Sequence, residues 1–198
     1  MGINLGSMGN GMAPILNLEK NDILDLTKRN PGLTNITVAC GWDTARVGSS
    51  FDLDVSALLL GSNGKLCDNK SIIYFNNKTA NGIRLNGDNL TGDGDGDDET
   101  IDVQLDRISP EVQRIVFSVN IYDAVNRRQT FGMVQNSYIR LINNAGGQEL
   151  CRFELKDNGS TSTAVIFAEL FRDNGEWQFK ALGDGRIADL TGLVNMYR

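Results

Sequence analysis

The chain has 198 residues, of which 40% are hydrophobic, and its 25 acidic and 19 basic residues give a formal net charge of −6. This length and apolar content predict one well-buried domain. The negative charge argues against nucleic acid as a partner, because phosphate binding relies on clustered Lys and Arg. Histidine is absent, which excludes Ser-His-Asp catalysis and removes the usual general base and zinc ligand.

Cysteine usage and hydropathy bear on the cellular compartment in which the protein is expected. Cys40, Cys67 and Cys151 are odd in number and show no CxxC spacing, so we expect reduced thiols in the core. The sequence has no recognisable secretory signal and no apolar run of about 18 residues. These features predict a cytoplasmic protein.

Residues 1–14 are rich in Gly and Met and have no periodicity. We expect them to form a flexible N-terminal tail or to be an expression remnant, and we expect residues 15–198 to form a single domain. From residue 15 onward, short apolar segments alternate with Gly- or Asn-containing turns, and several show the period of two that is typical of strands. The expected strands are 15–18, 23–27, 36–40, 51–60, 71–75, 101–105, 113–122, 138–142, 150–155, 164–171 and 176–181.

The strand expected at 51–60 begins with the sequence FDLD. Period two places Asp52 and Asp54 on one face, about 7 Å apart, so both carboxylates could reach one ion or two adjacent ions. The alternative interpretation is two exposed strand acids. Asp43, at the end of the strand that contains Gly41 and Trp42, is a third candidate ligand.

Residues 87–99, GDNLTGDGDGDDE, form the most acidic stretch of the chain. Carboxylates this close repel one another unless a cation lies among them, and the interleaved glycines allow sharp turns that aim several oxygens at one point. Calcium, which takes about 6–8 oxygen ligands in irregular geometry, fits better than magnesium. The alternative is a solvated acidic loop. The candidate ligands here are Asp88, Asn89, Asp93, Asp95, Asp97, Asp98 and Glu99.

Other calcium motifs fit this stretch less well. Read from Asp93, the EF-hand pattern requires Gly and Glu where Asp98 and Gln104 stand. The Gly-Asp alternation is typical of β-helix calcium repeats, but it occurs only once. We therefore expect neither an EF-hand nor a β-helix.

Helical periodicity is scarce. It indicates a short turn of helix at 109–112 and a helix at 188–197, and it leaves 123–130 open between helix and loop. Many short strands without βαβ alternation predict an all-β fold. We expect a β-sandwich of two packed, mainly antiparallel sheets, with a short C-terminal helix and calcium-binding loops at one end.

Seven segments, taken together, carry a family resemblance. They are LEK at 18–20, LTK at 26–28, GWD at 41–43, FDLD at 51–54, the acidic stretch at 87–99, TFG at 130–132 and FRDNGEW at 171–177. In this order they resemble motifs of the TerD family of tellurium-resistance and stress-response proteins, over about residue 15 to the C-terminus. The resemblance implies a calcium-binding β-sandwich and a link to tellurite, phage or other stress resistance. Asn21 stands where the family usually has Gly, and Asp93 where Glu is common.

The functional hypothesis is a calcium-binding, non-catalytic module that binds more than one calcium ion and acts as a scaffold or sensor with other stress-response proteins. A first alternative is a metal-dependent phosphotransfer or hydrolase enzyme, which needs two ions about 3.5–4 Å apart. A second is a calcium-dependent membrane-binding module, for which the acidic stretch offers mostly Gly and Asp rather than basic or apolar residues. Membrane association is therefore not indicated by the sequence.

Overall fold

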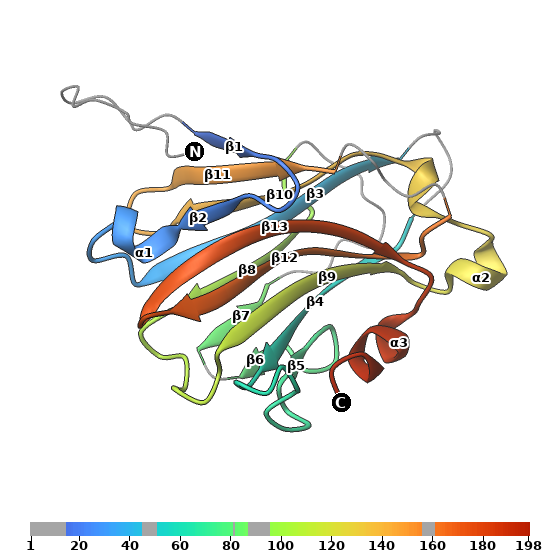
Figure 1. Ribbon diagram of the computed structural model, residues 1–198. Coiled ribbons are helices and arrows are strands. Elements are labelled where there is room, and N and C mark those ends of the chain that lie inside the picture. The colour runs from blue at the N-terminus through green and yellow to red at the C-terminus, as the bar shows by residue number, and fades with distance from the viewer. Residues whose placement is uncertain (1–14, 45–50, 81, 87–95, 156–160) are drawn as a thin grey trace.

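The computed structural model describes residues 15–44, 51–80, 82–86, 96–155 and 161–198. Two β-sheets pack face to face, which confirms the predicted all-β sandwich (Figure 1). The expected N-terminal tail at 1–14 lies outside the described residues, and calcium binding in the loops stays a prediction.

The first sheet has seven strands. In spatial order they are β1 (Leu16–Leu18), β11 (Gln148–Glu154), β10 (Val134–Asn143), β3 (Asn35–Thr44), β8 (Glu99–Gln104), β7 (Ile83–Leu85) and β6 (Thr79–Ala80). All neighbours are antiparallel except β1 and β11, which are parallel.

The second sheet has six strands, all antiparallel to their neighbours. In spatial order they are β2 (Ile23–Asp25), β13 (Glu176–Arg186), β12 (Ala164–Asp173), β9 (Arg114–Ile121), β4 (Leu53–Leu60) and β5 (Ile72–Ile73). The hairpin between β12 and β13 turns at Asn174 and Gly175, both with positive φ. An Asn-Gly pair adopts this conformation at little cost, so it is a strong hairpin signal.

The helices are short. They are α1 (Leu26–Arg29), α2 (Ala124–Arg127), the 3-10 helix η1 (Phe131–Met133) and α3 (Leu190–Asn195). The predicted C-terminal helix is confirmed in a shorter form, and the open segment at 123–130 contains α2. The helical turn expected at 109–112 is a turn only, with a hydrogen bond from Val112 N to Ser109 O. Within the described ranges, no helix has the length and hydropathy needed to cross a membrane.

Strand β4 is buried on both of its faces. Leu53, Val55, Ala57 and Leu59 face the core between the sheets. On the opposite face, Leu58 belongs to a second apolar cluster, which includes Leu193 and Val194 of α3. Each fully buried aliphatic side chain contributes about 1.5–3 kcal/mol of transfer free energy, so α3 is held to the sheet mainly by apolar packing.

Asn21 lies in the turn between β1 and β2 and has a φ of 71°. Its amide donates to Ala181 O at 2.8 Å, which ties the turn to β13. Asn tolerates the left-handed region better than most residues. The substitution of Asn for the usual Gly is therefore compatible with this turn.

Candidate functional site

The end of β3 lies beside the last three acids of the 87–99 stretch. Cys40 and Glu99 are cross-strand partners, and Asp98 N donates to Cys40 O at 2.9 Å. The Asp98 carboxylate in turn accepts a hydrogen bond from Trp42 N at 2.8 Å. The GWD segment and the acidic stretch, which are far apart in the sequence, therefore meet through the hydrogen bond from the Trp42 backbone to the Asp98 carboxylate.

Glu99 connects the two sheets. Its side chain is buried, with 3% of the residue exposed, and its Oε2 accepts a hydrogen bond from Val55 N at 2.9 Å. This amide is available because β5 pairs with β4 only at Ala57 and Leu58. The contact places the start of the FDLD strand next to the acidic stretch. Three of the predicted acidic segments thus converge at one end of the sandwich.

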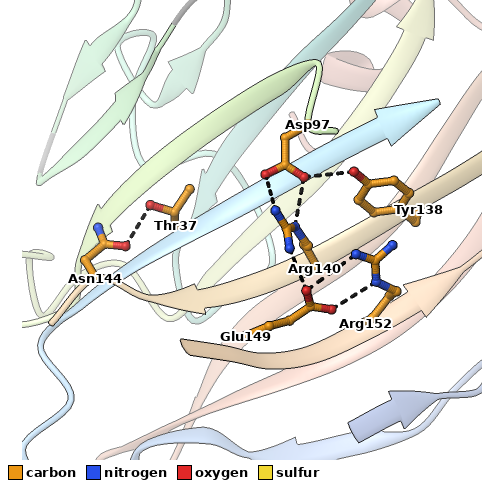
Figure 2. A network of polar contacts seen from close by, with 7 residues as sticks. All are labelled: Thr37, Asp97, Tyr138, Arg140, Asn144, Glu149 and Arg152. Atoms are coloured by element: carbon orange, nitrogen blue, oxygen red, sulfur yellow. Dashed lines mark hydrogen bonds and ion pairs between the residues drawn. The ribbon is translucent and has the colours of Figure 1, made fainter. Parts of the chain in front are cut away.

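Asp97 is held by side chains of a nearby strand (Figure 2). Its Oδ1 accepts hydrogen bonds from Tyr138 Oη at 2.9 Å and from Arg140 Nε at 2.8 Å, and its Oδ2 accepts one from Arg140 Nη2 at 2.7 Å. Both partners lie on β10. This bidentate pairing balances the carboxylate charge and fixes Asp97 to the outer face of the seven-stranded sheet.

The Asp97 pair continues into a network of alternating charges. Arg140 Nη1 donates to Glu149 Oε2 at 2.6 Å, and Arg152 Nε donates to Glu149 Oε1 at 2.9 Å. The Arg152 guanidinium also lies 4.2 Å from the centroid of the Tyr138 ring. Two carboxylates and two guanidinium groups thus form a neutral unit, which Figure 2 shows spanning β10, β11 and the loop before β8.

The titration behaviour of the network follows from these contacts. Burial raises the pKa of Glu149, but hydrogen bonds from Arg152 and Arg140 outweigh it, so the pKa is lowered overall. Burial and the hydrogen bond to Asp97 both raise the pKa of Tyr138. The Tyr138 hydroxyl therefore stays protonated and remains a donor to Asp97.

Gly41 makes room for this network. Tyr138 is its cross-strand partner, and a Cβ placed on Gly41 would lie 2.4 Å from atoms of the Tyr138 ring. Side chains larger than hydrogen would displace the ring from Asp97. The Gly of the GWD segment thus has a packing role. Tyr138, Arg140, Glu149 and Arg152 were not among the predicted site residues. The one local sign of this close approach in the sequence is the glycine beside Trp42.

The remaining predicted ligands lie at several places around this end. Asp43 is exposed and accepts a hydrogen bond from Asn136 Nδ2 at 2.7 Å. Asp52 forms an ion pair with Arg127 at 3.8 Å, and Asp54 Oδ2 accepts from Asn120 Nδ2 at 3.4 Å. As predicted, Asp52 and Asp54 share a face, since Leu53 and Val55 point into the core. That face is the outer surface of the six-stranded sheet.

The described residues contain no group of three or more Asp, Glu or Cys side chains placed to hold a metal ion. Four predicted ligands, Asp88, Asn89, Asp93 and Asp95, lie outside the described residues. The ligand set therefore stays a prediction. What the structure adds is the proximity of its segments, through the Asp98–Trp42 and Glu99–Val55 contacts.

Comparison with known proteins agrees with this architecture. The TerD domain family matches residues 14–197. The tellurium resistance protein TerD of Serratia marcescens is 43% identical over 185 residues, covering 92% of this chain and 96% of that protein. Stress response protein SCP2 of Bacillus subtilis (strain 168) is 42% identical over 197 residues, covering 92% and 98%.

A solved structure shows the same fold. The crystal structure of a homologue of telluride resistance protein (TerD) from Streptomyces coelicolor A3(2) superposes with a TM-score of 0.67 at 26% identity. The match covers 81% of this chain and 94% of that one. Family match, relatives and fold agree: the chain belongs to the TerD family of tellurium-resistance and stress-response proteins.

Proposed function

We propose that this protein is a calcium-binding, non-catalytic module that acts as a scaffold or sensor in a cytoplasmic stress-response complex. The observation that carries the proposal is the hydrogen bond from Val55 N to Glu99, which joins the FDLD strand to the acidic stretch across the two sheets. Relatives named for tellurium resistance and stress response support the biological setting.

One proposed ligand already has its charge balanced by a neighbouring cation. Asp97 receives three hydrogen bonds, two of them from the Arg140 guanidinium. We propose that Asp98 and Glu99, with Asp43, Asp52, Asp54 and the acids of residues 88–95, bind more than one calcium ion. Asp97 remains in the proposed set, with a smaller contribution.

The non-catalytic part of the proposal rests on the chemistry of the nucleophile candidates. Cys40 and Cys151 are buried, and burial raises the pKa of both thiols, to about 12 for Cys151. Thiols of this kind supply little thiolate at neutral pH. With no histidine in the chain, the common Cys-His and Ser-His arrangements are not available.

A calcium titration by isothermal calorimetry, with native mass spectrometry to count ions, tests the proposal. Asp98→Asn and Glu99→Gln should each weaken calcium binding at least tenfold, because calcium prefers charged oxygen ligands. The Gln side chain keeps an acceptor for the Val55 amide, so Glu99→Gln should still fold. Asp106→Asn, at an exposed acid in a turn, is the matched control.

The alternatives give different results in the same preparation. Equal calcium affinity in all three variants, or no calcium binding by the unmodified protein, would contradict the site. Sedimentation with anionic liposomes only in calcium would instead favour the membrane-binding alternative. Metal-dependent hydrolysis of a phosphate ester, abolished by Glu99→Gln, would favour the enzyme.

A further inference from the structure

A cavity of about 630 Å³ lies on the outer face of the six-stranded sheet, between α2 and the start of α3. Asp54 of β4 and Asn120 of β9, which are cross-strand partners, lie on its floor. Figure 1 shows α2 and α3 at the same end of the molecule. A volume of this size is typical of ligand-binding clefts.

The cavity lining is acidic. Asp54, Asp123 and Asp189 line it, and its described lining residues include neither Lys nor Arg. The nearby base Arg127 forms an ion pair with Asp52 and lies over the Tyr122 ring at 5.2 Å. The charge of the cavity is therefore complementary to a cation.

Asn120 gives a second and independent indication of a ligand. It is 4% exposed, and period two places it on the same face of β9 as Val116, which belongs to the apolar cluster under α3. Its side chain therefore stands on the cavity side of the sheet. Its Nδ2 donates to Asp54, but its Oδ1 has no hydrogen-bond partner among the described residues. A buried acceptor of this kind favours a ligand that brings a hydrogen-bond donor.

Large exposed hydrophobic side chains gather around this same cavity. Phe75, Tyr122, Val125 and Ile187 line it, with 37%, 49%, 82% and 79% of their surface exposed. They are half of the eight large hydrophobic residues that are exposed in the described part of the chain. Exposed apolar side chains that gather in one patch are typical of a protein interaction surface. A small cation on the floor would leave Val125 and Ile187 uncovered.

We propose that this cavity docks a segment of a partner protein that presents a lysine flanked by apolar residues. The lysine ammonium, with three donors, binds on the floor between the carboxylates of Asp54 and Asp123 and satisfies Asn120 Oδ1. The flanking apolar side chains cover Val125 and Ile187. This site requires no calcium, so it goes beyond the proposed function. Asp54 also belongs to the proposed calcium ligands, so the lysine site is assigned to the calcium-free protein.

The test is fluorescence anisotropy of the full-length protein with a labelled peptide, Ala-Leu-Lys-Leu-Ala, blocked at its C-terminus, in EDTA. The same peptide with norleucine in place of lysine should bind at least tenfold more weakly. Val125→Ser and Ile187→Ser should each weaken binding of the lysine peptide about fivefold. Ile23→Ser, the same kind of apolar-to-polar change at an exposed position of β2, should leave the affinity unchanged.

The acidic part of the cavity is tested by Asp123→Asn and Asp189→Asn. Asn tolerates the positive φ at position 123 and can replace the Asp189 cap of α3, so both variants should fold. Each should weaken the lysine peptide about fivefold without affecting the norleucine peptide, and Asp106→Asn should change neither.

Three results would overturn the proposal. One is equal affinity for the lysine and norleucine peptides. Another is displacement of the lysine peptide by n-butylammonium chloride at concentrations similar to those of the peptide, because the site would then be a small-cation pocket. The last is a lysine preference that appears only when calcium replaces EDTA, because the site would then belong to the calcium function.

Discussion

Replacing Arg140 with Ala removes the cation that joins Asp97 to Glu149. The Arg140 side chain is 24% exposed, whereas those of Asp97 and Glu149 are 15% and 11% exposed. Removing the guanidinium leaves two largely buried carboxylates facing each other with fewer donors. The protein should therefore lose more stability than is usual for a surface ion pair.

The size of the loss follows from the contacts. Removing one partner of a fully buried ion pair costs about 3–5 kcal/mol, while exposed pairs are worth about 0–1 kcal/mol. Because Arg140 is partly exposed and Arg152 still binds Glu149, we expect about 2–4 kcal/mol. For a chain of this length, that corresponds to a Tm lower by about 5–15 °C. Arg140→Lys should recover part of the loss, since a single ammonium cannot reproduce the bidentate contact.

Urea and thermal unfolding in EDTA measure this difference without any contribution from metal. Arg84→Ala is the matched control, because Arg84 is exposed on β7. If Arg140→Ala lowers the free energy of unfolding no more than Arg84→Ala does, Arg140 is not the stabilising cation of this network.

Three further predictions concern the same end of the molecule and the thiols. Gly41→Ala should destabilise the protein by about 1–3 kcal/mol, as overpacking does, because the added methyl meets the aromatic ring of its cross-strand partner; an unchanged urea midpoint would contradict this. The pKa of Glu149 is lowered in the folded protein, so its stabilising contribution is complete above its unfolded pKa of about 4.3 and is lost as pH falls through the folded pKa. The difference in unfolding free energy between the unmodified protein and Arg140→Ala should therefore shrink below about pH 4. A difference that grows below this pH would refute the prediction. Cys67 is partly exposed while the other two thiols are buried, so Ellman's reagent should modify one thiol rapidly in the native protein and all three in denaturant; rapid native modification of all three would show that the core is open.

The strands were predictable where their pattern was long enough. Residues 113–122 and 51–60 contain β9 and β4, because their alternation runs over several pairs of residues and is reinforced by β-branched side chains. Strands β6 and β7 have two and three residues, too few for a period to emerge. Helix α1 begins at Leu26, directly after β2, inside a segment whose apolar content indicated only a strand.

The candidate site was predictable in its segments but not in its pairings. The sequence identified Asp97 as a candidate ligand. Its partner Arg140 is 43 residues away on another strand, and no local sequence pattern encodes such a contact. The shared face of Asp52 and Asp54 followed from period two. That this face is the outer surface of the sheet depends on which side α3 and the core occupy, which is a tertiary property.

The most direct test of the central claim is thermal unfolding of the full-length protein in EDTA, in magnesium and in calcium at neutral pH. A site that binds the folded state only, at a hundredfold excess of calcium over Kd, adds about 2.7 kcal/mol, which is about 5–10 °C in Tm for this chain length. We predict that calcium raises Tm by at least this amount, that magnesium does much less, and that Glu99→Gln removes most of the calcium effect. Coincident melting temperatures in all three conditions would show that residues 87–99 are only a solvated acidic segment.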